Sequence, residues 1–341
     1  MSRINSRKME YGGFLPLELN PGEEYYAAYD DWLGRFNSVK AALDFLIRRL
    51  GLKKMHIPYY YCPSTIAAIK KAGIEVYFYH INEEFLPIDL LDEKNSSVLL
   101  ADYFGICKKK IIEAADMFQN AEIIIDRAHG FFEEPLIRGH VHNVYSAKKF
   151  FGIPDGAYLI SPAVTLDVHM QSEAHEYADY LLMSYESGTN AAYCKKKEAD
   201  QRLSVNYGGM SKLAVGLLKN VDYNRVKERR KENYKFLLSS FSNINELKLP
   251  KISAAYQFPL LISKEGREIK QKLIEEHIFV STFWDGKDLA EYGNAFEINM
   301  MENAVFLPMD QRYDEKDMGY IVSCVKKHMA DINSRRDIVT G

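Results

Sequence analysis

The sequence has few cysteines, no long apolar run and no membrane or secretion signal. Its four cysteines, Cys62, Cys107, Cys194 and Cys324, lie far apart without a CxxC pair, so their spacing indicates neither a zinc site nor a disulfide framework. No stretch approaches the roughly 18–20 consecutive apolar residues of a membrane span, and MSRINSRKMEYGG lacks the apolar region of a secretory signal. These absences favour a reduced, soluble, cytoplasmic protein.

Charge of either sign is not in excess. The chain has 44 basic and 47 acidic residues, a net charge of −3, and no basic block that would follow a phosphate backbone, which argues against a nucleic-acid partner. It also lacks the G-x-G-x-x-G fingerprint and the P-loop, so a dinucleotide or ATP site is disfavoured. What the sequence does have is 341 residues, 47% of them apolar, enough for one large domain with a smaller companion.

The first half alternates short apolar runs with segments of helical periodicity. Helices are predicted at 38–52, 63–73 and 109–119, and strands at 55–61, 74–81, 96–105, 121–130, 141–147 and 156–162. Continuous apolar runs such as EIII are typical of strands covered on both faces. The pattern therefore predicts an α/β fold with a mostly parallel central sheet covered by helices.

The second half changes character. Residues 165–241 are predicted to be mostly helical, with a long charged helix at 224–241. After it, a strand at 255–262, a helix at 266–278, a strand at 279–284 and a final helix at 315–329 indicate a small α+β unit. We therefore expect a large domain at 1–228 and a small C-terminal domain at 229–341.

Three predicted strand or helix ends carry polar residues. Asp126 directly follows three isoleucines, where a carboxylate is costly unless it meets a cation or strong donors. Lys148 and Lys149 follow the strand at 141–147. Asn37 or Ser38 precedes a helix and suits an N-cap. Each feature alone has a plain structural interpretation: a turn carboxylate, a solvated lysine pair and a helix cap.

Together the three features point to one ligand. In open α/β sheets, ligands bind beyond the carboxyl ends of the strands. A helix N-terminus suits an anion, a carboxylate can pair with a ring cation, and a lysine amine can react with an aldehyde. These are the groups that pyridoxal phosphate (PLP) requires, and we expect PLP rather than a metal as the cofactor.

The order of segments resembles the fold type I PLP enzymes, specifically the DegT-type nucleotide-sugar aminotransferases. The motifs that carry the resemblance are NSVKAAL at 37–43, IPYYYCPS at 57–64, DYFG at 102–105, DRAH at 126–129, PDG at 154–156 and LPMDQRYDEKDM at 307–318. The resemblance spans roughly residues 10–325. It implies a large PLP-binding α/β domain and a smaller C-terminal α+β domain.

The resemblance also implies roles for single residues. Lys149, five positions before PDG, matches the Schiff-base lysine, and Asp126 matches the carboxylate that pairs with the pyridine nitrogen. Ser146, three positions before Lys149, would give its hydroxyl to the cofactor phosphate. Lys148 would point the other way, toward solvent or a phosphate.

Further cofactor contacts are expected from the helix start, the aromatic loop and the DRAH turn. They are Ser38, Val39, Lys40, Tyr61 and His129. One of Tyr59, Tyr60 and Tyr61 would stack on the pyridine ring, or all three are core or rim aromatics. His129 would bond Asp126 or the phenolic oxygen of the cofactor, with a purely structural histidine as the alternative.

Three positions depart from the family pattern. Val39 stands where relatives have glycine, Cys62 where the stacking aromatic often falls, and Arg127 where a small residue adjoins the aspartate. Val39 cannot easily adopt a positive φ, so the loop geometry is expected to differ. These departures indicate a divergent branch, in which substrate identity transfers poorly.

The resemblance implies transfer of an amino group from glutamate or glutamine to a keto sugar nucleotide, in cell-surface polysaccharide or amino-sugar biosynthesis. It also implies a homodimer with a shared active site, and segment 203–211 with Asn206 is the candidate contribution from the neighbouring chain. Alternatives are a small non-sugar ketone as substrate, or a catalytically silent PLP-fold regulator or partner protein. A sugar dehydratase is disfavoured because those relatives carry histidine in place of the lysine.

Overall fold

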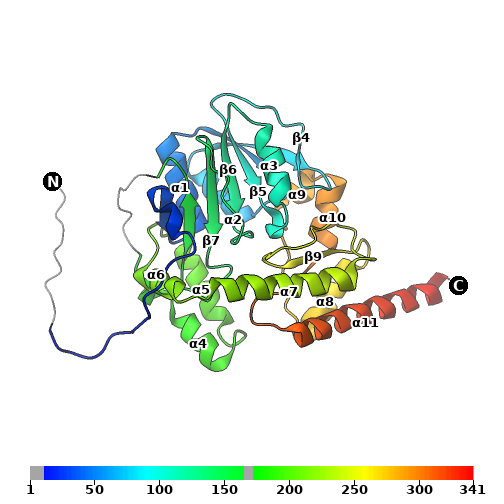
Figure 1. Cartoon of the computed structure of the whole chain (residues 1–341). Coiled ribbons are helices and arrows are strands. Elements are labelled where there is room, and N and C mark those ends of the chain that lie inside the picture. Colours follow the sequence, from blue (N-terminus) through cyan, green and yellow to red (C-terminus); the bar gives the residue numbers. More distant parts are fainter. Residues whose placement is uncertain (1–10, 165–171, 341) are drawn as a thin grey trace.

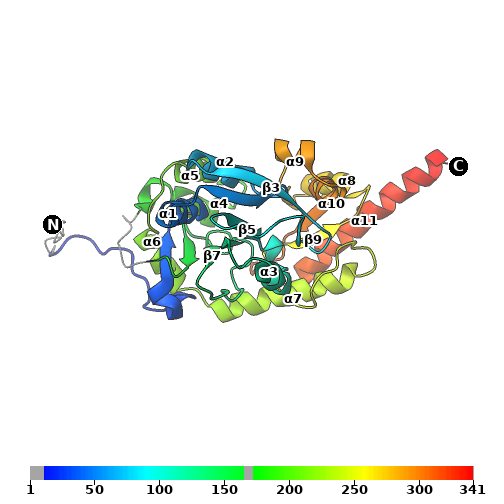
Figure 2. The ribbon, with the colours of Figure 1, turned by 90° about the horizontal axis from the view of Figure 1, so that it is seen from above.

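The computed structural model describes residues 11–164 and 172–340. Its centre is an eight-stranded sheet with the strand order β1-β8-β7-β6-β5-β2-β3-β4, flanked by helices (Figures 1 and 2). The strands are β1 (Leu33–Phe36), β2 (Lys54–Pro58), β3 (Glu75–Ile81), β4 (Pro87–Ile88), β5 (Ser97–Ala101), β6 (Glu122–Arg127), β7 (Val141–Ser146) and β8 (Ala157–Ile160).

The central part of the sheet is parallel. Strands β3, β2, β5, β6 and β7 pair in parallel, whereas β8, β1 and β4 join antiparallel. Strand β5 and residues Ile123–Ile125 of β6 are buried, as expected for apolar strands covered on both faces. The predicted α/β class with a mostly parallel sheet is confirmed.

Helix α1 (Val39–Leu50) shows how the sequence forms these covering layers. Ser38 caps its N-terminus, one stripe of apolar side chains is buried, and Gly51 ends it at φ 63°. Further helices of this half are α2 (Pro63–Lys71), α3 (Lys108–Asp116), α4 (Asp179–Ser187), α5 (Tyr193–Leu203) and α6 (Lys212–Lys219). The start of the helical region predicted at 165–241 lies outside the described residues.

The C-terminal part has its own apolar core. Long helix α7 (Tyr223–Phe241) packs beside α11 (Glu315–Thr340), as Figures 1 and 2 show. The other elements are β9 (Phe258–Leu261), α8 (Gly266–Glu275), α9 (Lys287–Tyr292), α10 (Ala295–Asn303) and β10 (Ala304–Leu307). This core runs from Tyr234 to Ile332. The domain boundary predicted at 228/229 falls inside α7 and stays a prediction.

Some elements differ from the sequence expectations. The strand predicted at 279–284 is wrong, because this extended segment forms only one isolated bridge, between Ser281 and Phe306. Helix α10 was not predicted, although Asn294 and Glu297 form a capping box that marks its start. Within the described parts of the chain, no helix is both long and apolar enough to cross a membrane.

Candidate active site

The predicted polar residues meet at one edge of the sheet. Strands β6 and β7 are parallel neighbours, so Asp126 near the end of β6 and Ser146 at the end of β7 lie on the same side. The backbone N–H of Gly156 donates to the carbonyl of Asn37 at 3.0 Å, which joins the loop after β7 to the start of α1. The helix start, the carboxylate and the lysine loop therefore share this edge.

Asp126 is a buried carboxylate with neutral partners. It is 8% exposed, the Tyr61 hydroxyl donates to its Oδ2, and the Ala128 N–H donates to its Oδ1 at 2.8 Å. Burial raises the pKa of Asp126, while these hydrogen bonds and the charge of Lys149 oppose the rise. Among the described residues it forms no ion pair, so it is free to meet a cationic group from a ligand.

Lys149 faces a neutral histidine. Its Nζ lies 2.8 Å from Nε2 of His129. The lysine side chain reaches solvent, but the surrounding protein desolvates the amine and lowers its pKa. His129 is 3% exposed, and burial together with Lys149 holds its pKa well below the usual value. The imidazole is therefore neutral, and it shares a hydrogen bond with the Lys149 amine.

Aromatic rings from the C-terminal part surround this pair. The His129 ring stacks on Tyr256 at 4.9 Å and on Trp284 at 5.7 Å. The Lys149 amine lies 5.4 Å from the ring centre of Tyr256 and 6.0 Å from that of Phe283. Sequence reasoning missed these three aromatics, because no local motif connects them to a lysine more than a hundred residues earlier.

Lys148 points elsewhere. Its Nζ forms an ion pair with Asp200 of α5 at 2.8 Å and lies 5.6 Å from the ring centre of Tyr180. Lys148 thus has a protein carboxylate as its partner, where solvent or a phosphate was expected. Only Lys149 contacts His129.

The start of α1 offers donors to an anion. The Ser38 hydroxyl accepts from Ala41 N at 3.2 Å, whereas the N–H groups of Val39 and Lys40 have no partner among the described residues. Val39 has ordinary helical geometry, so its replacement of glycine causes no strain. Ser146 is 7% exposed, and its hydroxyl is also unpartnered within the described chain.

Segment 203–211 lies against the same helix start. The Asn37 side chain donates to the carbonyl of Asn206 at 2.7 Å, and the Asn37 N–H donates to the carbonyl of Gly208 at 2.9 Å. The backbone of this segment is thus held beside the anion site of its own chain. A contribution of Asn206 to a neighbouring chain stays a prediction.

The three loop tyrosines have partners inside the chain. Tyr61 is bonded to Asp126, the Tyr60 hydroxyl donates to the carbonyl of Phe283 at 2.9 Å, and Tyr59 stacks on Phe78. Stacking of a tyrosine on a cofactor ring stays a prediction.

Cys62 precedes α2 and lies close to the lysine site. Burial acts to raise its pKa, but hydrogen bonds from Ser64 and Thr65 and the charge of Lys149 lower it on balance. A thiol therefore lies near the lysine, at a position where the resemblance predicted an aromatic ring.

Arg127 has a structural partner. Adjacent strand residues point to opposite faces, so Arg127 turns away from the Asp126 side. Its Nη1 pairs with Oδ2 of Asp102 at 2.9 Å, with side chains 2% and 0% exposed. The unusual arginine is thus explained by a buried ion pair between β6 and the end of β5.

Comparison with known proteins gives structural but no sequence matches. No protein-family model matches the chain, and no curated protein sequence matches it. Spr1654 from Streptococcus pneumoniae in its PLP form is 16% identical with a TM-score of 0.62, covering 88% of this chain and 87% of that chain. CalS13, a sugar aminotransferase from Micromonospora echinospora, is 13% identical with a TM-score of 0.59 and 89% of each chain covered.

A third similar structure has a different activity. It is the E. coli GDP-4-keto-6-deoxy-D-mannose-3-dehydratase with bound hydrated PLP, 14% identical with a TM-score of 0.60, covering 89% of this chain and 92% of that chain. Identities this low show a shared fold and not a shared activity. The chain therefore has the fold type I architecture of these PLP-containing enzymes.

Proposed function

We propose that the protein is a PLP-dependent aminotransferase. The observation that carries the proposal is the combination of Lys149 and Asp126 at one sheet edge, each with neutral partners inside the chain. The charges of Asp126 and Lys149 act on each other, but neither group has an ion-pair partner among the described residues. Both groups are therefore available to a ligand that carries an aldehyde and a ring cation.

The residues present fit PLP. The unpartnered N–H groups of Val39 and Lys40 and the Ser146 hydroxyl would bind its phosphate at the start of α1. Asp126, held by Tyr61 and Ala128, would keep a proton on the ring nitrogen. PLP, when bound, supplies a reactive aldehyde and an electron-accepting ring.

Lys149 would act as nucleophile and proton carrier. Its lowered pKa increases the fraction of unprotonated amine, which is the form that attacks a carbonyl and accepts a proton. The hydrogen bond between His129 Nε2 and Nζ directs the amine. From this position Nζ would take the proton from the α-carbon of the amino donor. In the second half of the reaction it would deliver a proton to the α-carbon of the amino product.

We propose a keto sugar nucleotide as acceptor and glutamate or glutamine as donor. Similar folds with a sugar aminotransferase and with a dehydratase of a GDP-keto sugar support this substrate class. Lys149 favours amine transfer over dehydration. A small non-sugar ketone is the second candidate, because Lys149 and Asp126 provide for transamination without specifying the acceptor.

A cytoplasmic homodimer with a shared active site completes the proposal. Residues 11–19 run away from the body in Figure 1 and expose several large apolar side chains, including Phe14 at 92% and Leu15 at 83%. Val205, beside Asn206, is 67% exposed. Exposed apolar groups of this kind suit an interface with a second copy. The four free thiols agree with a reducing compartment.

The test is a half-reaction in the purified protein loaded with PLP. The visible absorbance should bleach on addition of glutamate or glutamine, and one keto sugar nucleotide from a panel should restore it. A panel of small ketones serves as the competing arm. If the protein binds PLP but none of the amino donors bleaches its absorbance, the proposed activity is contradicted. That result would favour a silent PLP-fold partner protein.

Sedimentation tests the assembly separately. A homodimer is expected, and Asn206→Ala should weaken PLP binding if this residue reaches the neighbouring site. A fully active monomer would contradict the shared site while leaving the aminotransferase proposal intact.

A further inference from the structure

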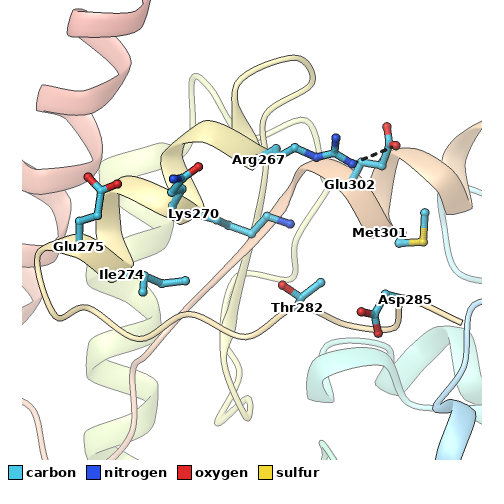
Figure 3. A pocket seen from close by; sticks show the side chains of 9 residues that line it. Arg267, Lys270, Ile274, Glu275, Thr282, Asp285, Met301 and Glu302 are labelled. Carbon is cyan, nitrogen blue, oxygen red and sulfur yellow. Dashed lines mark hydrogen bonds and ion pairs between the residues drawn. The ribbon is translucent and has the colours of Figure 1, made fainter.

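A second pocket lies in the C-terminal part, apart from the lysine site. It has a volume of about 610 Å³ and lies between α8, α10 and the extended segment 281–285 (Figure 3). Its lining includes Arg267, Lys270, Thr282, Asp285, Met301 and Glu302. None of these residues takes part in the proposed transamination.

Lys270 is the unusual residue of this pocket. It is 9% exposed, yet its amine has no hydrogen bond or ion pair among the described residues. Figure 3 shows the amine projecting from α8 into the space between Arg267 and Thr282. Burial, followed by the charge of Arg267, lowers the Lys270 pKa, and the charge of Glu302 opposes this shift. Lysines with so little exposed surface are normally paired, so this amine, which reaches the pocket, is open to an anionic ligand.

The other charged residues of the pocket limit which ligand can pair with Lys270. Arg267 is paired with Glu302 at 3.3 Å and Glu275 with Lys272 at 3.0 Å, so these charges are balanced. Exposed Asp285 has no partner among the described residues. A doubly charged anion would meet repulsion from Asp285. The side chains of Ile274 and Met301 add apolar lining suited to an aliphatic group.

We infer that this pocket binds a small aliphatic organic acid whose single carboxylate pairs with the Lys270 amine. The carboxylate supplies the ion-pair partner that Lys270 lacks among the described residues, and the aliphatic part packs on Ile274 and Met301. This inference does not depend on the proposed aminotransferase activity.

The same segment that lines the pocket also covers the lysine site. Thr282 and Asp285 face the pocket, while Phe283 and Trp284 between them pack on the His129 ring at 5.1 and 5.7 Å. A ligand against Thr282 therefore contacts the backbone that carries Trp284. Because the chain has only two tryptophans, Trp284 is a built-in fluorescent reporter once Trp32 is replaced.

The test is a fluorescence titration of Trp32→Phe protein with acetate, butanoate and hexanoate, with hexanamide as the neutral match. Hexanoate should give a saturable change in Trp284 emission, and the dissociation constant should fall about fourfold per added methylene. Lys270→Met should weaken hexanoate binding at least tenfold, the size expected when one charged hydrogen bond is lost. Lys326→Met, which removes an exposed lysine outside the pocket, should bind like the parent.

Lys270→Met should fold, since an apolar side chain of similar length replaces an unpaired buried amine. Its urea midpoint is measured alongside, and Thr282→Val serves as a second variant from the opposite wall. Equal binding of hexanamide and hexanoate, unchanged binding in Lys270→Met, or absence of a saturable change would each overturn the inference. Tighter, Lys270-dependent binding of inorganic phosphate would overturn the assignment to a carboxylate.

Discussion

Two buried carboxylates lie near the ends of the neighbouring strands β5 and β6, and their partners differ. Asp102 pairs with the guanidinium of Arg127, so its charge is balanced within the chain. Asp126, the residue directly before that arginine, has only the Tyr61 hydroxyl and a backbone N–H. Asp102 needs no ligand to balance its charge, whereas Asp126 can pair with a cationic group of a ligand.

The two adjacent lysines repeat this contrast. Lys148 is neutralised by Asp200, whereas Lys149 faces the neutral ring of His129. Desolvation lowers the pKa of both lysines, but only Lys148 has an ion-pair partner among the described residues. Groups balanced inside the chain stabilise the fold, and groups left with neutral partners are the candidates for chemistry.

The largest effect that separates the two lysines is expected from Lys149→Ala. It should abolish the visible absorbance of covalently held PLP and slow the half-reaction with glutamate by roughly 10²–10⁴-fold, since the proton carrier is lost. Lys148→Ala should keep the absorbance. Reduction with borohydride followed by peptide mapping checks the assignment, and a label on Lys148 would show that the lysines were assigned in the wrong order.

The substitution Arg127→Met breaks the buried ion pair between Asp102 and Arg127. Removing one partner leaves the Asp102 carboxylate buried and unpaired, so the free energy of unfolding should fall by about 3–5 kcal/mol. Urea denaturation measures this loss. The double variant Asp102→Leu with Arg127→Met should recover part of it, because no charge remains buried. A single variant as stable as the parent would refute the structural role.

The substitution Asp126→Asn tests the role of the carboxylate without an ion-pair partner, because it keeps the shape of the side chain but removes its charge. PLP should still bind, whereas the half-reaction should slow by ~10²-fold or more, since each 1.36 kcal/mol added to the barrier is tenfold in rate. Single-turnover kinetics with glutamate give the measurement. A variant that binds PLP and reacts at the parent rate would show that Asp126 is only a turn residue.

The smallest effect concerns His129 and pH. Its folded pKa lies below the unfolded value, so below about pH 6.5 the unfolded chain binds a proton that the folded chain does not. Stability should therefore fall as the pH drops from 6.5, by up to about 1.4 kcal/mol per pH unit.

His129→Asn should remove this share of the pH dependence. Urea unfolding at pH 7, 6 and 5 compares the two proteins, with His175→Asn, at an exposed position, as the control. Parallel stability curves for parent and His129→Asn would contradict a neutral buried imidazole.

Local patterns in the sequence were enough for the α/β alternation, the capped start of α1, and Asp126 and Lys149 as candidates. Apolar periodicity, caps and turn residues act between near neighbours, so they can be read without the fold. Strand β1 and helix α10 were not predicted. Strand β1 is a four-residue edge strand, which carries little pattern.

Only the tertiary structure decided which charges are balanced and which are open. Asp102 and Arg127 are 25 residues apart, Lys148 and Asp200 are 52 apart, and Trp284 stacks on His129 from a segment more than 150 residues later in the chain. The unpartnered amine of Lys270 likewise becomes visible only when α8, α10 and segment 281–285 enclose it. These partnerships depend on strand order and on the packing of distant segments, which no local pattern encodes.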